Sequence, residues 1–254
     1  MSEFFNLALV QPLFNLLVLL QSFIPGGDFG IAVILLTILV KVILFPLNQK
    51  AILSQRDLQK LQPQLQSIQQ KYKDNKEKLA QESMKLYKDH KVNPLGGCLP
   101  LLIQLPILLA LFQIFRTITT IDLNTLYSFI PRPEAIHTTF LGIVDLGKAS
   151  IELAIIAGAL QFIQAKFMQQ RQQLGVTPQK DGKKDDSGKE GAVHKPANQQ
   201  VMMQAMQKQM LYFMPGLTVF ISLTLPGALP LYWAANTAFS IVQEQYLWRG
   251  YKKA

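Results

Sequence analysis

The sequence predicts an all-α membrane protein with five transmembrane helices, an N-terminal interfacial helix and a cytoplasmic helical hairpin. Only 16% of its 254 residues are charged, against about 25% in soluble domains. A helix needs about 20 apolar residues to cross a bilayer, and the stretches without Asp, Glu, Lys or Arg are 4–27, 92–115 and 209–243. This pattern excludes an ordinary soluble enzyme and a disordered chain. The single cysteine excludes an intramolecular disulfide.

The basic residues set the predicted orientation. The net charge is +9, and of 25 Lys and Arg residues ten lie in 48–95, eight in 166–208 and three in 249–254. Loops rich in Lys and Arg stay in the cytoplasm, so these segments are expected there and 117–148 outside. No phosphate-binding glycine loop accompanies the basic segments, so nucleic-acid specificity is not expected.

Residues 1–28 are expected to form a helix in the outer membrane interface. A span here would leave residue 1 in the cytoplasm with no basic residue to hold it. Gln11, Asn15 and Ser22 fall on a narrow arc of the helix, which suits an interfacial helix. A sixth span over 4–24 is the less favoured alternative.

The first span is predicted over residues 29–47 and the cytoplasmic hairpin over 48–95. Pro46 ends the span, because proline removes a backbone donor and clashes with the preceding turn. In the hairpin, apolar residues recur at helical spacing, and Pro63 restarts its first arm. These residues are Leu58, Leu61, Leu65, Ile68 and Tyr72.

The rest of the chain divides at glycine and proline breaks. Gly96-Gly97 precedes the second span, and Pro226-Gly227 separates the last two. The third span carries Glu152 and Lys166, so it is expected to face other helices rather than lipid. The predicted segments are the second span 96–116, an outer loop 117–148, the third span 149–168, a flexible cytoplasmic loop 169–207, the fourth span 208–225, the fifth span 226–248 and a basic cytoplasmic tail 249–254.

Motifs for enzymatic chemistry are lacking. The sequence contains no HExxH and no GxSxG, and its spans carry no pair of acidic residues for acid–base work. We therefore predict that the protein is not an enzyme and uses no metal or cofactor.

Lys41 is the residue that most needs an explanation, because a cation within a span costs about 2.5–3.5 kcal/mol. In one interpretation its ammonium snorkels to the cytoplasmic headgroups. In the other it lies in a hydrated site within the bundle, with Thr37 one turn outward on the same face. Other spans offer the polar side chains of Gln104, Gln161, Gln164 and Asn236, each of which could instead form an interhelical hydrogen bond. Tyr232 and Trp233 are either interfacial anchors or contacts for a substrate.

Several sequence blocks resemble the YidC/Oxa/Alb family of membrane protein insertases. The most specific is KVNPLGGC at 91–98 followed by PLLIQ at 100–104. The other matches are QPLF at 11–14, ILLTILVK at 34–41, FPL at 45–47, LQP at 61–63, LYW at 231–233 and RG at 249–250. They follow the family order over nearly the whole chain.

The resemblance implies an insertase and chaperone of the short form, without a large outer domain. It implies a hydrophilic groove open to the cytoplasm and to lipid, with Lys41 as its central cation. The predicted groove-lining set is Lys41, Thr37, Gln104, Gln161, Gln164, Tyr232, Trp233 and Asn236. The family usually has Arg where this chain has Lys41, and lysine cannot bind a carboxylate in bidentate fashion.

The partners implied are nascent membrane proteins, the lipid bilayer and the ribosome, with the Sec translocon as a further candidate. The absence of a transit peptide favours a bacterial plasma (inner) membrane. The alternative function is a small channel or secondary transporter. That class needs a path through both faces of the membrane and usually internal repeats, which the sequence lacks.

Overall fold

The computed structural model describes residues 3–93, 96, 99–118, 125–133, 136–175 and 211–251. These residues are mostly helical, as predicted. The helices are α1 (Glu3–Phe5), the π-helical turn η1 (Asn6–Val10), α2 (Gln11–Phe23), the 3-10 turn η2 (Pro25–Gly27), α3 (Phe29–Ile43), α4 (Phe45–Lys60), α5 (Gln62–Lys71), α6 (Lys76–Asp89), α7 (Leu99–Thr117), α8 (Ile151–Gly175) and α10 (Ala228–Tyr251). An apolar helix, Leu211–Ser222, lies between α8 and α10 in the chain.

A short antiparallel hairpin departs from the all-α expectation. It consists of β1 (Thr139–Phe140) and β2 (Val144–Asp145), with Phe140 opposite Val144. Strands of this length carry no readable alternation of polar and apolar residues. The outer loop predicted over 117–148 therefore contains regular structure that its sequence did not reveal.

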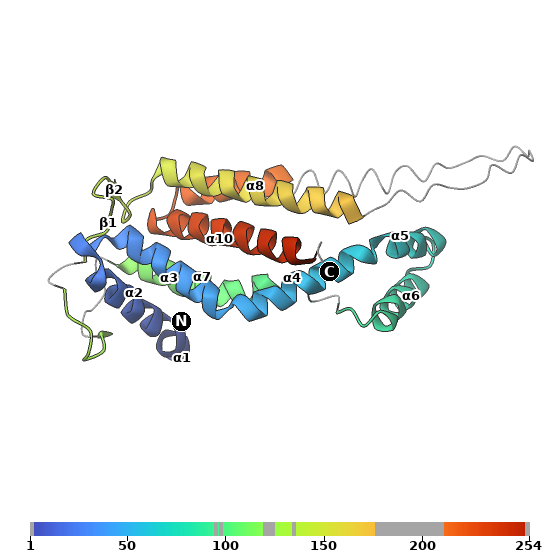
Figure 1. Ribbon diagram of the computed structural model, residues 1–254, viewed down its shortest axis with the longest axis horizontal. Coiled ribbons are helices and arrows are strands. Elements are labelled where there is room, and N and C mark those ends of the chain that lie inside the picture. The colour runs from blue at the N-terminus through green and yellow to red at the C-terminus, as the bar shows by residue number, and fades with distance from the viewer. Residues whose placement is uncertain are drawn as a thin grey trace, which may run out of the picture.

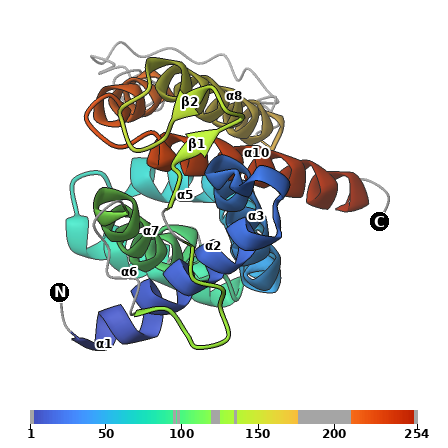
Figure 2. The same ribbon diagram turned by 90° about the vertical axis from the view of Figure 1, so that its left-hand side faces the viewer.

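The molecule is elongated, with β1 and β2 at one end and α5 and α6 at the other (Figure 1). Viewed from the β1–β2 end, α10 lies between α8 and α3 (Figure 2). On its other side α3 packs against α2. The apolar core joins α2, α3, α7 and α10, and its largest fully buried side chains include Phe14, Leu36, Ile114 and Leu229.

The first predicted span is a bent pair of helices. Asp28 caps α3, since its Oδ1 accepts a hydrogen bond from the Ile31 N–H at 2.9 Å. At Leu44 the chain turns by 65° into α4. Pro46 lies in the first turn of α4, where its missing N–H is tolerated. The helix of the span thus ends before Pro46, but the chain continues as a second helix to Lys60.

Proline and asparagine divide the basic segment into three helices, and the break at Pro63 is the expected one. Pro63 lies in the first turn of α5, directly after the end of α4. Asn75 caps α6, because its Oδ1 accepts from the Lys78 N–H at 3.0 Å. Helices α5 and α6 pack against each other, and α5 also contacts α4.

Two polar side chains of α2 bind the backbone of the loop that contains Thr125 and Tyr127. The Asn15 side chain is 1% exposed, and its Nδ2 donates to the Thr125 carbonyl at 3.2 Å while its Oδ1 accepts from the Tyr127 N–H at 2.6 Å. The Nε2 of Gln11 also donates to the Thr125 carbonyl, at 3.1 Å. The loop thus satisfies the amides of Gln11 and Asn15, and the position of this helix in the outer interface stays a prediction. Ser22 is exposed, as expected.

Length and composition single out two described helices as long and apolar enough to span a membrane, Glu3–Phe23 and Ile151–Gln170. The bent pair α3–α4 adds a third if it counts as one span. The apolar helices Leu102–Thr117 and Leu211–Ser222 are shorter. The chain is a membrane protein, and its count of five spans stays a prediction.

Helix α8 differs from its prediction in length and in the face it buries. It runs to Gly175, past the predicted end at 168. One face is buried, but isoleucines elsewhere on the helix are exposed: Ile151, Ile155, Ile156 and Ile163. Glu152 and Lys166 are exposed too. The expectation that this helix faces other helices is thus wrong for much of its surface, because apolar residues surround it on all sides and suit lipid.

Gly158 allows close packing of α8 against Leu211–Ser222. A Cβ at Gly158 would meet the Val219 side chain and the Pro215 carbonyl, whereas a Cβ at Gly216 would have nothing within 4 Å. We expect Gly158→Ala to lower the free energy of unfolding by about 1–3 kcal/mol, as overpacking does, and Gly216→Ala to have no such effect. Denaturation in mild detergent measures both variants. Equal stability of the two would contradict this packing.

Candidate functional site

Lys41 lies between α3 and α10. Its side chain is 8% exposed, and its Nζ donates to Ser240 Oγ at 2.9 Å. The Ser240 hydroxyl donates in turn to the Asn236 carbonyl at 2.8 Å. The ammonium is therefore held by a neighbouring helix of the bundle. A lone buried cation would be unfavourable, and this hydrogen bond replaces part of its lost hydration.

Glu244 brings a negative charge to the same site from one turn further along α10. Its carboxylate lies within electrostatic range of the Lys41 ammonium but does not form an ion pair with it. Its Oε1 also accepts a hydrogen bond from Gln164 Nε2 on α8 at 3.0 Å. Lys41, Ser240, Glu244 and Gln164 thus form one polar cluster across α3, α10 and α8, called the Lys41 cluster below.

Ser240 and Glu244 were not predicted from the sequence. A signal for them exists, because Glu244 is the first charged residue after the uncharged stretch 209–243. It also follows Ser240 by four residues, which places both on one face of a helix. The sequence alone does not reveal which face of the last helix meets Lys41.

The structure brings some of the predicted site residues together and separates others. Gln104 Nε2 donates a hydrogen bond to the Tyr232 hydroxyl. This bond joins α7 to α10 and is a second polar contact between helices, separate from the Lys41 cluster. Thr37 is buried one turn from Lys41, but its hydroxyl donates to the Val33 carbonyl of its own helix at 2.7 Å.

The three other predicted residues have different surroundings. Trp233 is half-buried and packs against the apolar core. Asn236 contributes its backbone carbonyl to Ser240. The side-chain oxygen of Gln161 is buried and has no hydrogen-bond partner among the described residues.

The end of the bundle that carries β1 and β2 is tied together by polar contacts. Gln21 Nε2 donates to the carbonyls of Gly27 and His137, at 2.8 Å and 3.1 Å. The Leu141 N–H donates to Asp28 Oδ2 at 2.5 Å. Phe140 lies directly over Gly30, where any side chain would collide with its ring. The β1–β2 hairpin is therefore fixed on the start of α3.

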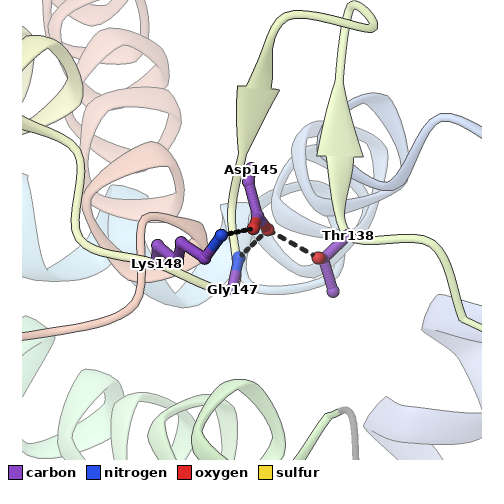
Figure 3. Close-up of polar contacts among 4 residues, drawn as sticks. All are labelled: Thr138, Asp145, Gly147 and Lys148. Atoms are coloured by element: carbon purple, nitrogen blue, oxygen red, sulfur yellow. Dashed lines mark hydrogen bonds and ion pairs between the residues drawn. The ribbon is translucent and has the colours of Figure 1, made fainter.

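Asp145 stabilises the base of this hairpin (Figure 3). Its Oδ1 accepts from Thr138 Oγ1 at 2.8 Å and from the Gly147 N–H at 2.9 Å, and Lys148 Nζ lies 3.3 Å from Oδ2. The Thr138 hydroxyl first, then the Gly147 N–H, and to a lesser degree Lys148, lower the pKa of Asp145. The stabilisation is therefore present above the ordinary pKa of an aspartate and is lost as the pH falls through the lowered value.

Within the part of the chain that the structure describes, no three His, Cys, Asp or Glu side chains gather as a metal site requires. The predicted block KVNPLGGC lies partly outside the described residues, as does most of the predicted loop 169–207. The chemistry that the described site offers is electrostatic: a buried cation, an adjacent carboxylate and several hydrogen-bonding groups.

Comparison with known proteins gives consistent matches. The family model described as the 60Kd inner membrane protein matches residues 19–254. A protein named membrane protein insertase YidC from Fusobacterium nucleatum is 34% identical over 222 residues, which cover 87% of this chain and 86% of that protein. Proteins of the same name from Actinobacillus succinogenes and Pelobacter propionicus are 34% and 32% identical, over 96% and 87% of this chain. The matched regions span only 38% and 35% of those two longer proteins.

Proposed function

Because this chain belongs to the 60Kd inner membrane protein family, we propose that it moves nascent membrane proteins from the cytoplasm into the bilayer. The matched relatives are named membrane protein insertases. The proposed path is a hydrophilic groove centred on Lys41. Membership of this family makes the protein a non-enzymatic membrane insertase. The groove, its central cation and the partners below are the proposal.

The observation that carries this proposal is the burial of Lys41 against Ser240. Attraction between charges is screened far less in a protein interior than in water. A cation held there attracts an acidic tail of a nascent chain that would otherwise stay hydrated. The polar side chains of Gln104, Gln161, Gln164, Tyr232 and Asn236 would help to replace the water that such a tail loses.

The contacts at the β1–β2 end support a groove that is closed on the outer side. Gln21, Asp28 and Phe140 fasten the hairpin over the start of α3. A channel or secondary transporter needs a continuous path through both faces, which this closure disfavours. The basic hairpin α5–α6 lies at the opposite end (Figure 1), which we assign to the cytoplasm because basic segments stay there.

The α5–α6 hairpin is the proposed contact for the ribosome. Among the described helices it packs chiefly on itself and on α4, and its outer surface is the face we propose for a partner. Counting both ends, six lysines lie from Lys71 to Lys88, and such a basic surface attracts the acidic surface of a ribosome. The Sec translocon remains a candidate partner on the family resemblance alone.

Site-specific crosslinking tests the proposed path. A photoreactive residue at position 37, 104 or 233 should form adducts with stalled nascent chains that carry an acidic tail. The same residue at Ile155, which is 57% exposed on α8, is the matched control and should give few adducts. Equal yields from Ile155 and from the groove positions would contradict this path.

A further inference from the structure

Lys41 has a hydrogen-bond acceptor and, one turn further along α10, a carboxylate from its own chain. Ser240 Oγ accepts its hydrogen bond at 2.9 Å, and Glu244 lies one turn beyond Ser240 on the same face of α10. Gln164 on α8 holds the carboxylate of Glu244 by a hydrogen bond of 3.0 Å. In this arrangement, the helix that holds the cation proposed to attract acidic substrates already carries a negative charge one turn away.

The register of the helices places Glu244 between Lys41 and the end of the molecule that carries α5 and α6. Helices α3 and α10 run parallel, since Lys41 contacts Ser240 at 2.9 Å and the Phe45 carbonyl accepts from Gln243 at 3.5 Å. Both helices begin at the β1–β2 end (Figure 1). Four residues advance a helix by about 6 Å. A substrate that arrives from the basic end would therefore meet Glu244 before it meets Lys41.

We propose that Glu244 is a built-in counter-charge for Lys41, with which the acidic segment of a substrate must compete when it approaches the cation. This inference rests on the proposed function and adds a specificity-determining residue to it. A substrate without acidic residues leaves this arrangement intact and gains nothing from Lys41. A substrate with acidic residues must outcompete a carboxylate that is already in place, so Glu244 raises the acidity needed to use the site.

Gln164 has a defined part in this exchange. Its amide donates to Glu244 from α8, while Lys41 on α3 is hydrogen-bonded to Ser240, one turn earlier on α10. When a substrate carboxylate takes the cation, Glu244 keeps the hydrogen bond from Gln164 and remains paired. The carboxylate of Glu244 is thus not left buried without a partner, a state that would be strongly unfavourable.

The test uses a matched pair of single-spanning substrates, one with an acidic tail and one with the same tail neutralised. Their initial rates of insertion are measured in vesicles that contain the full-length protein. Glu244→Gln keeps a hydrogen-bonding partner for Gln164 but removes the charge. It should raise the rate for the acidic tail about two- to fivefold, the range expected for a partly exposed pair of charges, and leave the neutral tail unchanged.

Two control variants separate charge from structure. Glu244→Asp keeps the charge and should keep the wild-type ratio of the two rates. Glu152→Gln makes the same chemical change at the exposed start of α8 and should have no effect. An unchanged or lower rate for the acidic tail in Glu244→Gln overturns the inference, and an equal fall for both tails shows that Glu244 only supports the fold.

A double variant distinguishes failure of this inference from failure of the proposed function. In Lys41→Ala the preference for the acidic tail should vanish, and adding Glu244→Gln should then bring no gain. If Lys41→Ala keeps the preference, the proposed function is wrong. If Lys41→Ala loses it but Glu244→Gln alone changes nothing, only the counter-charge role is wrong. If Glu244→Gln still speeds insertion of the acidic tail in the Lys41→Ala background, the counter-charge role is wrong as well.

Discussion

Lys41→Ala should lower the insertion of single-spanning substrates with acidic tails by about tenfold or more, the scale of losing one partner of a buried charge pair. Lys41→Arg should retain most of the activity, because the charge is kept. Lys41→Glu should be the most severe variant, since it places a second carboxylate beside Glu244, and like charges at such a site repel. Insertion into vesicles containing each variant measures these effects.

The neutralised tail is the control for this prediction. Its insertion should fall much less in Lys41→Ala, because apolar contact with lipid and with the helices supplies most of its driving force. Equal loss for both tails would show that Lys41 maintains the hydration or the fold of the site. Full activity of Lys41→Ala on both tails would show that the charge has no role in insertion.

Removing the α5–α6 hairpin should reduce insertion strongly while leaving the bundle folded. In a deletion of residues 62–89 bridged by a short flexible linker, the core of α2, α3, α7 and α10 should stay packed, because among the described helices α5 and α6 pack chiefly on each other and α5 on α4. A hairpin that holds the ribosome near the site raises the local concentration of the nascent chain. Its loss should lower co-translational insertion about tenfold or more.

One control measurement and one further variant accompany this deletion. Resistance of the membrane-embedded part to protease should match that of the intact protein. A second variant keeps the hairpin but replaces Lys73, Lys76 and Lys78 with glutamine, and it should show an intermediate loss if charge attracts the partner. Full insertion activity of the deletion variant would falsify the partner role of the hairpin.

Much of the helical framework could be predicted from local sequence signals. Pro46, Pro63 and Asn75 each mark a helix boundary through backbone chemistry that acts within a few residues. The resemblance to the insertase family was confirmed by the match to residues 19–254. The need of Lys41 for a polar partner also followed from the sequence, because a cation within an apolar stretch needs a partner wherever the helix lies, and Ser240 is that partner.

The remaining features depend on contacts between distant parts of the chain. The pairing of Gln164 with Glu244, and of Asn15 with the backbone near Thr125, is set by packing that no local pattern encodes. A polar residue on a helix looks the same in sequence whether it faces water, a loop or another helix. For α8, apolar residues all around the helix gave no indication of which side is buried.

The bend at Leu44 has a consequence for the bilayer itself. Helix α3 has 15 residues and so measures about 22 Å, whereas the hydrocarbon core of a bilayer is about 30 Å thick. A span this short can be accommodated by local thinning of the lipid, at a fraction of a kcal/mol per Å. If α3 crosses the bilayer by itself, we expect the apolar barrier beside it to be thinner than in the surrounding membrane, so that a polar segment would have a smaller dielectric barrier to cross there.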